Sequence, residues 1–181
     1  MERSLKYTAT AKWLHWFLGL VVIVMLIFGR GLEGMEIPER TDTLMIHSGL
    51  GTIVLILMIV RLAWRKTHQP PDAEAAMSTM QVRLSLIMHL SLYGLLILQP
   101  ILGILQAAYI TEYQVLAFGV IDYASLATDD AGMARIFHIM HGINATVLSV
   151  LVLGHIGAAF YHHFVRKDQT MRKMIPFGKV K

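Results

Sequence analysis

Four long apolar runs, separated by shorter polar segments, dominate this chain of 181 residues. The runs cover residues 8–28, 44–64, 84–108 and 133–165. Each reaches the roughly 20 residues that an α-helix needs to cross the hydrocarbon layer of a bilayer. Because backbone polar groups in lipid must be bonded within their own segment, we expect all four runs to be helices. The sequence therefore predicts an all-α integral membrane four-helix bundle that forms a single domain over residues 1–181.

The overall composition is typical of a membrane protein. Hydrophobic residues make up 55% of the chain and charged residues only 15%, whereas soluble domains carry about 25% charged residues. This excludes a disordered chain and an ordinary soluble domain. The chain has no cysteine, which excludes Cys-ligated zinc, iron–sulfur clusters and covalently attached c-type haem. The basic residues form no patch interleaved with aromatic residues, so nucleic acid is not an expected partner.

The distribution of Lys and Arg predicts the orientation of the chain. Thirteen of the 16 basic residues fall in the N-terminus, in the 65–83 loop together with Arg61, and in the C-terminal tail. The opposite side has only Arg30, Arg40 and Arg135, and it carries eight of the 12 acidic residues. By the positive-inside rule, both termini are expected to be cytoplasmic.

The histidines carry the chemistry of the chain. Ionisable residues in membrane helices are rare and usually functional, and seven of the nine histidines lie inside or at the edge of the expected helices. These seven are His15, His47, His89, His138, His141, His155 and His162. A single such histidine often does no more than hydrogen-bond to a backbone carbonyl, but seven together call for a common cause.

Helical periodicity selects two pairs from this set. His141 and His155 are 14 residues apart, which places them within about 40° on the helix and about 21 Å apart along it. Following the chain across the bilayer, His15 shares the inner level with His155, and His47 shares the outer level with His141. Paired imidazoles without a nearby carboxylate or thiolate favour bis-His haem iron over a hard cation or structural zinc.

A small residue follows each of these four histidines four positions later, on the same helical face. The small residues are Gly19, Gly51, Ala145 and Ala159. We interpret them as the space that a macrocycle needs when it lies along a helix, although small residues are also common wherever membrane helices pack. Arg61, 14 residues after His47, is expected near the inner pair. It could bind a haem propionate or extend to the cytoplasmic headgroups.

Three stretches resemble the bacterial cytochrome b561 family of four-helix dihaem membrane proteins. They are residues 13–16 (Trp-Leu-His-Trp), residues 45–49 (Met-Ile-His-Ser-Gly) and the most specific match, residues 155–170. The resemblance covers nearly the whole chain and implies two b-type haems in a bacterial inner membrane. It assigns the axial ligands to His15, His47, His141 and His155.

The resemblance also implies electron transfer with a membrane quinone such as ubiquinone. Quinone chemistry moves protons as well as electrons, so the site needs titratable side chains near a haem. We expect His89 and His162 to serve, because imidazole exchanges protons near neutral pH. The alternative is that both only hydrogen-bond at the cytoplasmic interface. Near His162, Lys167 and Asp168 are expected to form an exposed pair at a helix end.

The partner on the outer side is less constrained. Some family members are said to oxidise superoxide, but net negative outer loops disfavour capture of an anion unless Arg30, Arg40 and Arg135 cluster near the outer haem. An acidic outer face instead favours a basic periplasmic redox partner.

Two further functions stay open at the level of sequence. The chain could be a haem-bearing membrane anchor subunit that serves a partner redox protein, since it has no soluble catalytic domain of its own. It could also be a proton-coupled transporter with a histidine relay. Transporters more often carry intramembrane carboxylates and broken helices, whereas all 12 acidic residues here fall outside the apolar cores.

Overall fold

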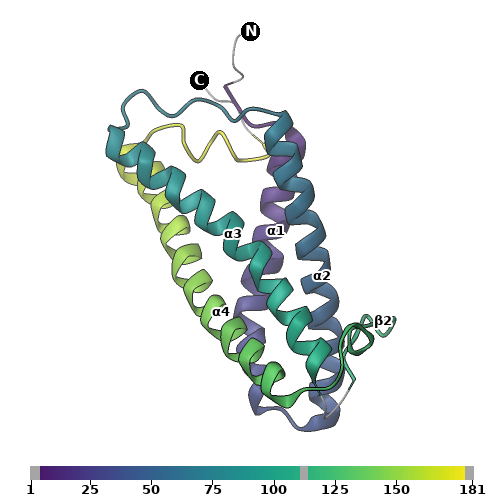
Figure 1. Cartoon of the computed structure of the whole chain (residues 1–181). Helices are drawn as coiled ribbons and strands as arrows, with labels where there is room; N and C mark the ends of the chain where they lie inside the picture. Colours follow the sequence, from purple (N-terminus) through teal and green to yellow (C-terminus); the bar gives the residue numbers. More distant parts are fainter. Residues whose placement is uncertain (1–4, 111–113, 178–181) are drawn as a thin grey trace.

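The computed structural model describes residues 5–110 and 114–177 and is mostly helical (Figure 1). Four long helices run up and down the molecule, namely α1 (Ala9–Phe28), α2 (Ile37–Thr67), α3 (Thr79–Tyr109) and α4 (Ala131–Phe160). All four are long and apolar enough to cross a membrane. The predicted all-α four-helix membrane bundle is confirmed. The described chain begins and ends at one end of the bundle, which we call the proximal end; the opposite end is the distal end.

Local sequence signals set the starts of three helices. The side chain of Thr8 caps α1 by accepting a hydrogen bond from a backbone amide of the first turn. Ser78 and Gln81 form a reciprocal capping box at the start of α3, and Asp130 accepts from two backbone amides at the start of α4. Each cap satisfies amides that have no partner within the helix.

The segments between the helices contain more structure than the expected polar loops. Helix α2 begins at Ile37, well before the expected residue 44, and a 3-10 helix, η1 (Gly29–Gly34), precedes it. The segment between α3 and α4 holds a short antiparallel hairpin, β1 (Leu116–Ala117) and β2 (Ile121–Asp122), followed by the 3-10 turn η2 (Ala124–Leu126). Helix α4 continues into a turn of π-helix, η3 (Tyr161–Arg166).

Helices that are consecutive in sequence pack on each other. Leu18 and Val22 of α1 form a buried cluster with Val54 and Met58 of α2. Helices α1 and α4 hardly approach each other over the described ranges, so side chains rather than close backbone packing connect them.

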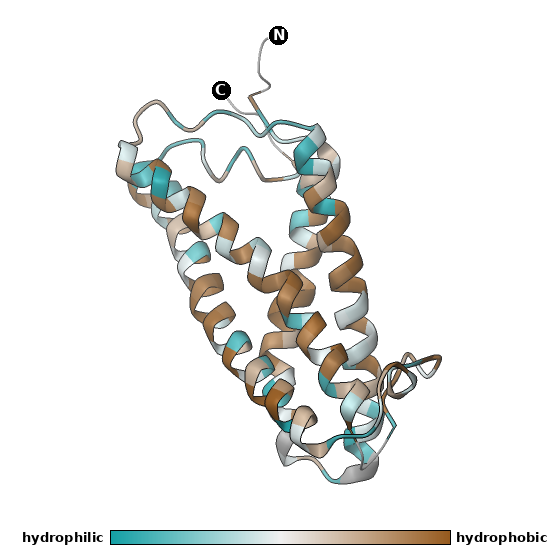
Figure 2. Ribbon diagram, in the orientation of Figure 1, coloured by the Kyte–Doolittle hydropathy of each residue, from teal (hydrophilic) through white to brown (hydrophobic). Residues whose placement is uncertain are grey.

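The four helices are apolar over most of their length, as Figure 2 shows. Large hydrophobic side chains are exposed along all four helices, including Leu20, Ile56, Leu90 and Leu153. An apolar surface of this extent needs lipid rather than water as its solvent.

Candidate functional site

Two histidine pairs lie at two levels of the bundle, and α4 contributes one member to each. His141 of α4 faces His47 of α2 toward the distal end, with ring centroids 6.3 Å apart. His155 of α4 faces His15 of α1 toward the proximal end, with ring centroids 6.0 Å apart. We call these the distal pair and the proximal pair. The four rings that the sequence selects are thus brought together in these two combinations.

Glycines on neighbouring elements make room for the rings of the distal pair. A Cβ atom on Gly29 would lie 3.1 Å from Cε1 of His47, and a Cβ atom on Gly103 would lie 3.1 Å from Cε1 of His141. Both distances are shorter than ordinary van der Waals contact. A Cβ at either position would require the neighbouring imidazole to shift by a few tenths of an ångström, so glycine leaves room for each ring where it lies.

Helix α3 also fixes the ring of His141 by hydrogen bonds. Nδ1 of His141 donates to the backbone carbonyl of Gln99 at 3.0 Å. Nε2 therefore keeps a lone pair, which accepts from the side-chain amide of Gln99 at 3.0 Å. Buried Asn144 donates to Oε1 of Gln99 at 2.6 Å and so orients that amide. A carbonyl partner on Nδ1 is the usual arrangement of a histidine that ligates a metal through Nε2. A metal bound there would take the place of the Gln99 amide as the partner of Nε2.

A cavity of about 210 Å³ lies beside the distal pair. Its walls are mainly apolar, and they include His47 and His141 together with the small residues Gly51 and Ala145. Two of the four small residues expected to flank a macrocycle therefore line a cavity. Gly19, near the proximal pair, has no atom within 4 Å of the position that a Cβ would take.

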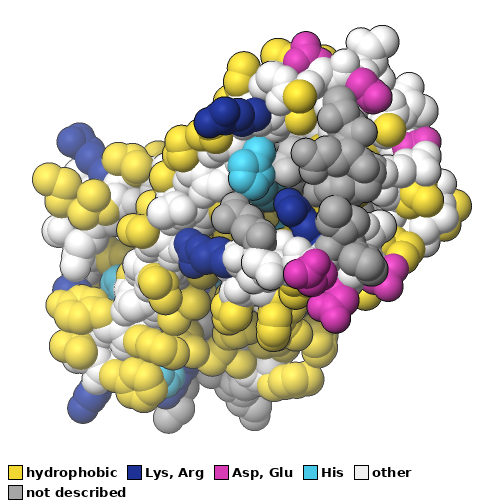
Figure 3. All heavy atoms as spheres, turned by 90° about the horizontal axis from the view of Figure 1, so that it is seen from below, with side chains coloured by type: hydrophobic (Ala, Val, Ile, Leu, Met, Phe, Trp, Pro, Cys, Tyr) yellow, Lys and Arg dark blue, Asp and Glu magenta, His cyan; other side chains and the backbone are white. Residues whose placement is uncertain are grey.

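Basic side chains gather at the same cavity. Arg30, Arg40 and His138 all line it, and Nη2 of Arg30 donates to Oγ of Ser149 on α4 at 3.1 Å. Figure 3 looks onto this end, where basic and histidine side chains lie centrally and acidic ones lie farther out. Paired imidazoles, small apolar walls and nearby guanidinium groups fit a b-type haem, which is a flat apolar ring with two carboxylates.

The proximal pair has a third histidine beside it. His89 of α3 lies next to His155, with ring centroids 5.4 Å apart, and its Nδ1 donates to the backbone carbonyl of Ser85 at 2.6 Å. His15, His89 and His155 therefore form a cluster contributed by three helices.

Arg61 is held inside the bundle next to this cluster. Its Nη2 lies 3.5 Å from Nδ1 of His15. Its Nε donates to the hydroxyl of Tyr93 at 3.1 Å, and its Nη1 donates to the carbonyl of Ala11 at 3.0 Å. These contacts with α1 and α3 hold the guanidinium beside the proximal pair.

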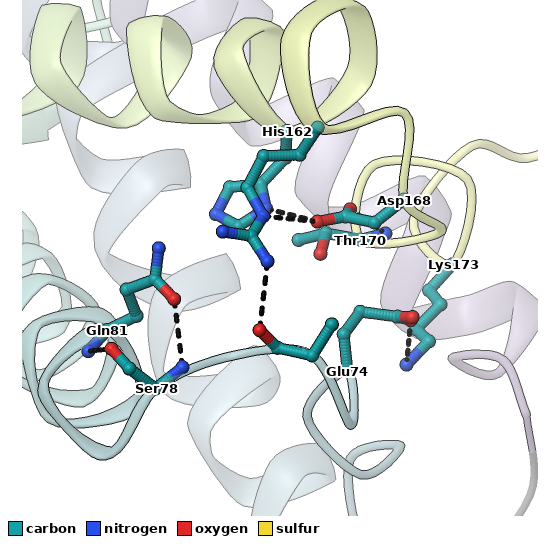
Figure 4. Close-up of polar contacts among 9 residues, drawn as sticks. Glu74, Ser78, Gln81, His162, Asp168, Thr170 and Lys173 are labelled. Carbon is teal, nitrogen blue, oxygen red and sulfur yellow. Dashed lines mark hydrogen bonds and ion pairs between the residues drawn. The ribbon is translucent and has the colours of Figure 1, made fainter.

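His162 lies in η3, apart from the three-histidine cluster. Its Nδ1 donates to Oδ2 of Asp168 at 2.6 Å, as Figure 4 shows, and no ring contact joins it to His89 or His155 in the part of the chain that the structure covers. Asp168 also accepts from the backbone amide of Thr170 at 3.0 Å and lies 3.7 Å from Arg166. The expected exposed pair of Lys167 with Asp168 is wrong, because Asp168 turns inward to these partners and is only 11% exposed.

The surroundings of Asp168 change its acidity. Burial alone would raise the pKa of its carboxyl, but the hydrogen bonds from His162 and Thr170 outweigh burial and hold the pKa below the usual 3.8. Asp168 therefore stays ionised at neutral pH and connects η3 to the C-terminal tail.

Comparison with known proteins finds relatives over nearly the whole chain. Residues 6–177 match the family model described as prokaryotic cytochrome b561. The chain is 30% identical over 177 residues to a Yersinia pestis protein named probable superoxide oxidase CybB, with 94% of this chain and 96% of that protein covered. It is 26% identical over 179 residues to cytochrome b561 homolog 1 of Escherichia coli strain K12, with 96% and 99% covered. It is 25% identical over 178 residues to homolog 2 of the same organism, with 94% and 91% covered.

Proposed function

Because the chain belongs to the prokaryotic cytochrome b561 family, whose members transfer electrons in the membrane through b-type haem, we propose that it carries two haem b groups, one at each histidine pair. His47 and His141 would hold the haem at the distal level, and His15 and His155 would hold the haem at the proximal level. Each haem would supply one-electron redox chemistry. The observation that carries this proposal is the pair of facing imidazoles at each of two levels, with α4 common to both.

The remaining side chains position the two groups. At the distal level, Gly51 and Ala145 provide the flat walls, and Arg30 and Arg40 are placed to bind carboxylates. At the proximal level, Arg61 next to His15 is the candidate for a propionate contact. Gly19 and Ala159 are the corresponding small residues.

Quinone exchange, with ubiquinone as the substrate, is assigned to the proximal end. His89 is supported by its contact with His155, which puts a titratable group beside a haem ligand. His162 is supported by Asp168, which holds Nδ1 and thereby leaves Nε2 to exchange a proton. The Lys and Arg bias supports a cytoplasmic proximal end in a bacterial inner membrane, with both termini inside.

The direct test is a dithionite-reduced minus oxidised spectrum of the purified protein, with haem quantified per chain. We expect two b-type haems, and one after His47→Ala or His141→Ala. His68→Ala is the matched control, because His68 is exposed and stacks on Trp64 at the proximal end. Two haems remaining in His141→Ala would refute the ligand assignment.

Superoxide is the electron donor that the distal cavity favours. Although the distal loops are net negative, Arg30 and Arg40 line the cavity together with both distal histidines, and cationic side chains at a site favour the approach of an anion. The name of the Yersinia pestis relative points the same way. Arg30→Gln with Arg40→Gln should slow haem reduction by superoxide and weaken its salt dependence, whereas exposed Arg135→Gln should not. Equal rates in all three proteins would leave a basic periplasmic redox protein as the better donor.

An assay of quinone reduction by the purified protein also distinguishes a free-standing enzyme from a membrane anchor subunit. A free-standing oxidoreductase reduces quinone by itself when the distal haem is supplied with electrons. An anchor subunit takes up electrons but reduces quinone only when its partner redox protein is added. Membership of the family favours the oxidoreductase and the anchor subunit over the histidine-relay transporter.

A further inference from the structure

The β1–β2 hairpin projects sideways from α2 near the distal end (Figure 1), and its tip is apolar (Figure 2). The exposed fraction is 47% for Phe118, 81% for Val120 and 47% for Ile121. Residues 116–121 contain no charged side chain. An exposed apolar tip on an otherwise polar connection is expected to contact something other than water.

Contacts with α2 fix the depth of the hairpin. The backbone amide of Phe118 donates to the carbonyl of Met45 at 3.1 Å, and a Cβ on Gly49 would fall 2.6 Å from the ring of Phe118. Asp42 is the last charged residue of α2 before its apolar stretch. Counted from Asp42 at 1.5 Å per residue, Met45 lies about 4.5 Å and Gly49 about 10.5 Å farther along the helix. The hairpin is therefore attached where headgroups give way to acyl chains.

The apolar surface of the hairpin lies at the same depth as exposed apolar side chains of α2. Ile46, next to Met45, is 58% exposed. The hairpin thus adds apolar surface at a level where α2 itself already presents apolar side chains to lipid.

The backbone of the tip is suited to this environment. The amide of Gly119 donates to the carbonyl of Leu116 at 3.1 Å, and the amide of Val120 donates to the carbonyl of Ala117 at 3.0 Å. Gly119 has φ +72°, a conformation that glycine adopts without strain and that closes this tight turn. Because both tip amides are bonded within the hairpin, moving the tip out of water exposes neither as an unsatisfied donor.

We propose that residues 118–121 insert into the boundary between headgroups and acyl chains of the bilayer leaflet at the distal end, as a fixed interfacial anchor. The occupant is lipid rather than a protein, because the tip extends along the membrane plane at the depth of the apolar part of α2. The anchor also supports the distal cavity. Tyr123, directly after β2, lines the cavity and is hydrogen-bonded to Thr52 of α2.

The test uses the absence of cysteine, which makes any introduced cysteine a unique labelling site. Val120→Cys carries an environment-sensitive fluorophore in the full-length protein, reconstituted in phosphatidylcholine vesicles. Thr128→Cys, exposed in the same distal connection, is the matched control. We expect blue-shifted emission for the label at position 120. We also expect several-fold stronger quenching there by lipids with a spin label high on the acyl chain than at position 128.

Other outcomes would overturn the proposal. Equal quenching at the two positions by a water-soluble quencher would place the tip in water. Disulfide cross-linking between copies of Val120→Cys would show that the tip contacts a second copy of the chain and not lipid. If Val120→Cys does not retain the wild-type haem spectrum, Ile121→Cys gives the same comparison from the next residue of the tip.

Discussion

The distal and proximal pairs use the same residue type, but their surroundings differ. Around the distal pair, glycines of other elements lie directly against the rings, and one cavity lies alongside. Around the proximal pair, a third imidazole and the guanidinium of Arg61 are the neighbours. The distal site is therefore shaped by close packing and the proximal site by polar contacts. Substitutions that add volume should harm the first site, and substitutions that remove polar groups should harm the second.

The largest expected effect is the loss of a haem from the proximal site, which distinguishes the histidines that ligate it from the histidine beside them. His155 contacts both His15 and His89. If His15 and His155 are the ligands, His155→Ala lowers the haem content from two to one per chain, while His89→Ala keeps both haems and slows quinone reduction. Loss of a haem in His89→Ala, with both retained in His15→Ala, would instead make His89 the ligand.

A volume change at Gly103 tests the packing of the distal site. Gly103→Val places side-chain atoms against His141, and overpacking of this kind destabilises by about 1–3 kcal/mol. The haem content of the distal site and the thermal stability of the protein should both fall. Gly94→Ala on the same helix is the control, because a Cβ there meets no atom within 4 Å; alanine should be neutral or slightly stabilising in the helix. Similar losses in both variants would mean that α3 tolerates no substitution and that the contact with His141 is not the cause.

A smaller effect is expected from Asp168 in the proximal tail. Because its folded-state pKa is lowered, the stabilisation that it provides is complete above its ordinary pKa and is lost as pH falls through the lower folded value. Asp168→Asn removes this dependence and weakens docking of the tail by roughly 1–2 kcal/mol. A spin label on Arg172→Cys reports tail mobility; it should increase at acidic pH in the parent protein and be pH-independent with Asp168→Asn.

The smallest effect concerns the loop that receives the tail. Nζ of Lys173 lies 2.6 Å from Glu74 and also donates to the backbone carbonyl of Asp72. Glu74→Gln keeps the second contact, so docking should weaken by only about 0.2–1 kcal/mol. The same spin label should detect a smaller increase in mobility than in Asp168→Asn. An equal or larger increase would show that Lys173, not Asp168, is the main attachment.

The sequence predicts those features that depend on one helix at a time. Hydropathy identifies the four spans, and the 14-residue spacing in α4 places His141 and His155 on one face. Hydropathy reports only the part of a helix suited to lipid, so it misses the polar first turns of α2, which contain Glu39, Arg40 and Asp42.

Features made by two elements could not be predicted in this way. The four-residue spacing after each histidine concerns the helix that carries that histidine, and it predicts Gly51 and Ala145. It missed Gly29 and Gly103, which lie against the same rings from other elements. The sequence predicts only a polar segment between α3 and α4, and the hairpin with its contact to Met45 is found only in the structure. Asp168 next to Lys167 suggested a local ion pair, whereas the π-helical turn and the left-handed Lys167 (φ +54°) accompany its pairing with His162.

The shared use of α4 has a consequence for how the protein is made. A chain leaves the ribosome N-terminus first, so α1 and α2 enter the membrane while His15 and His47 still have no facing imidazole. Neither pair exists until the last helix has been synthesised and has joined the other three. Both sites are therefore completed by one late assembly event, and a chain truncated before residue 141 would form neither.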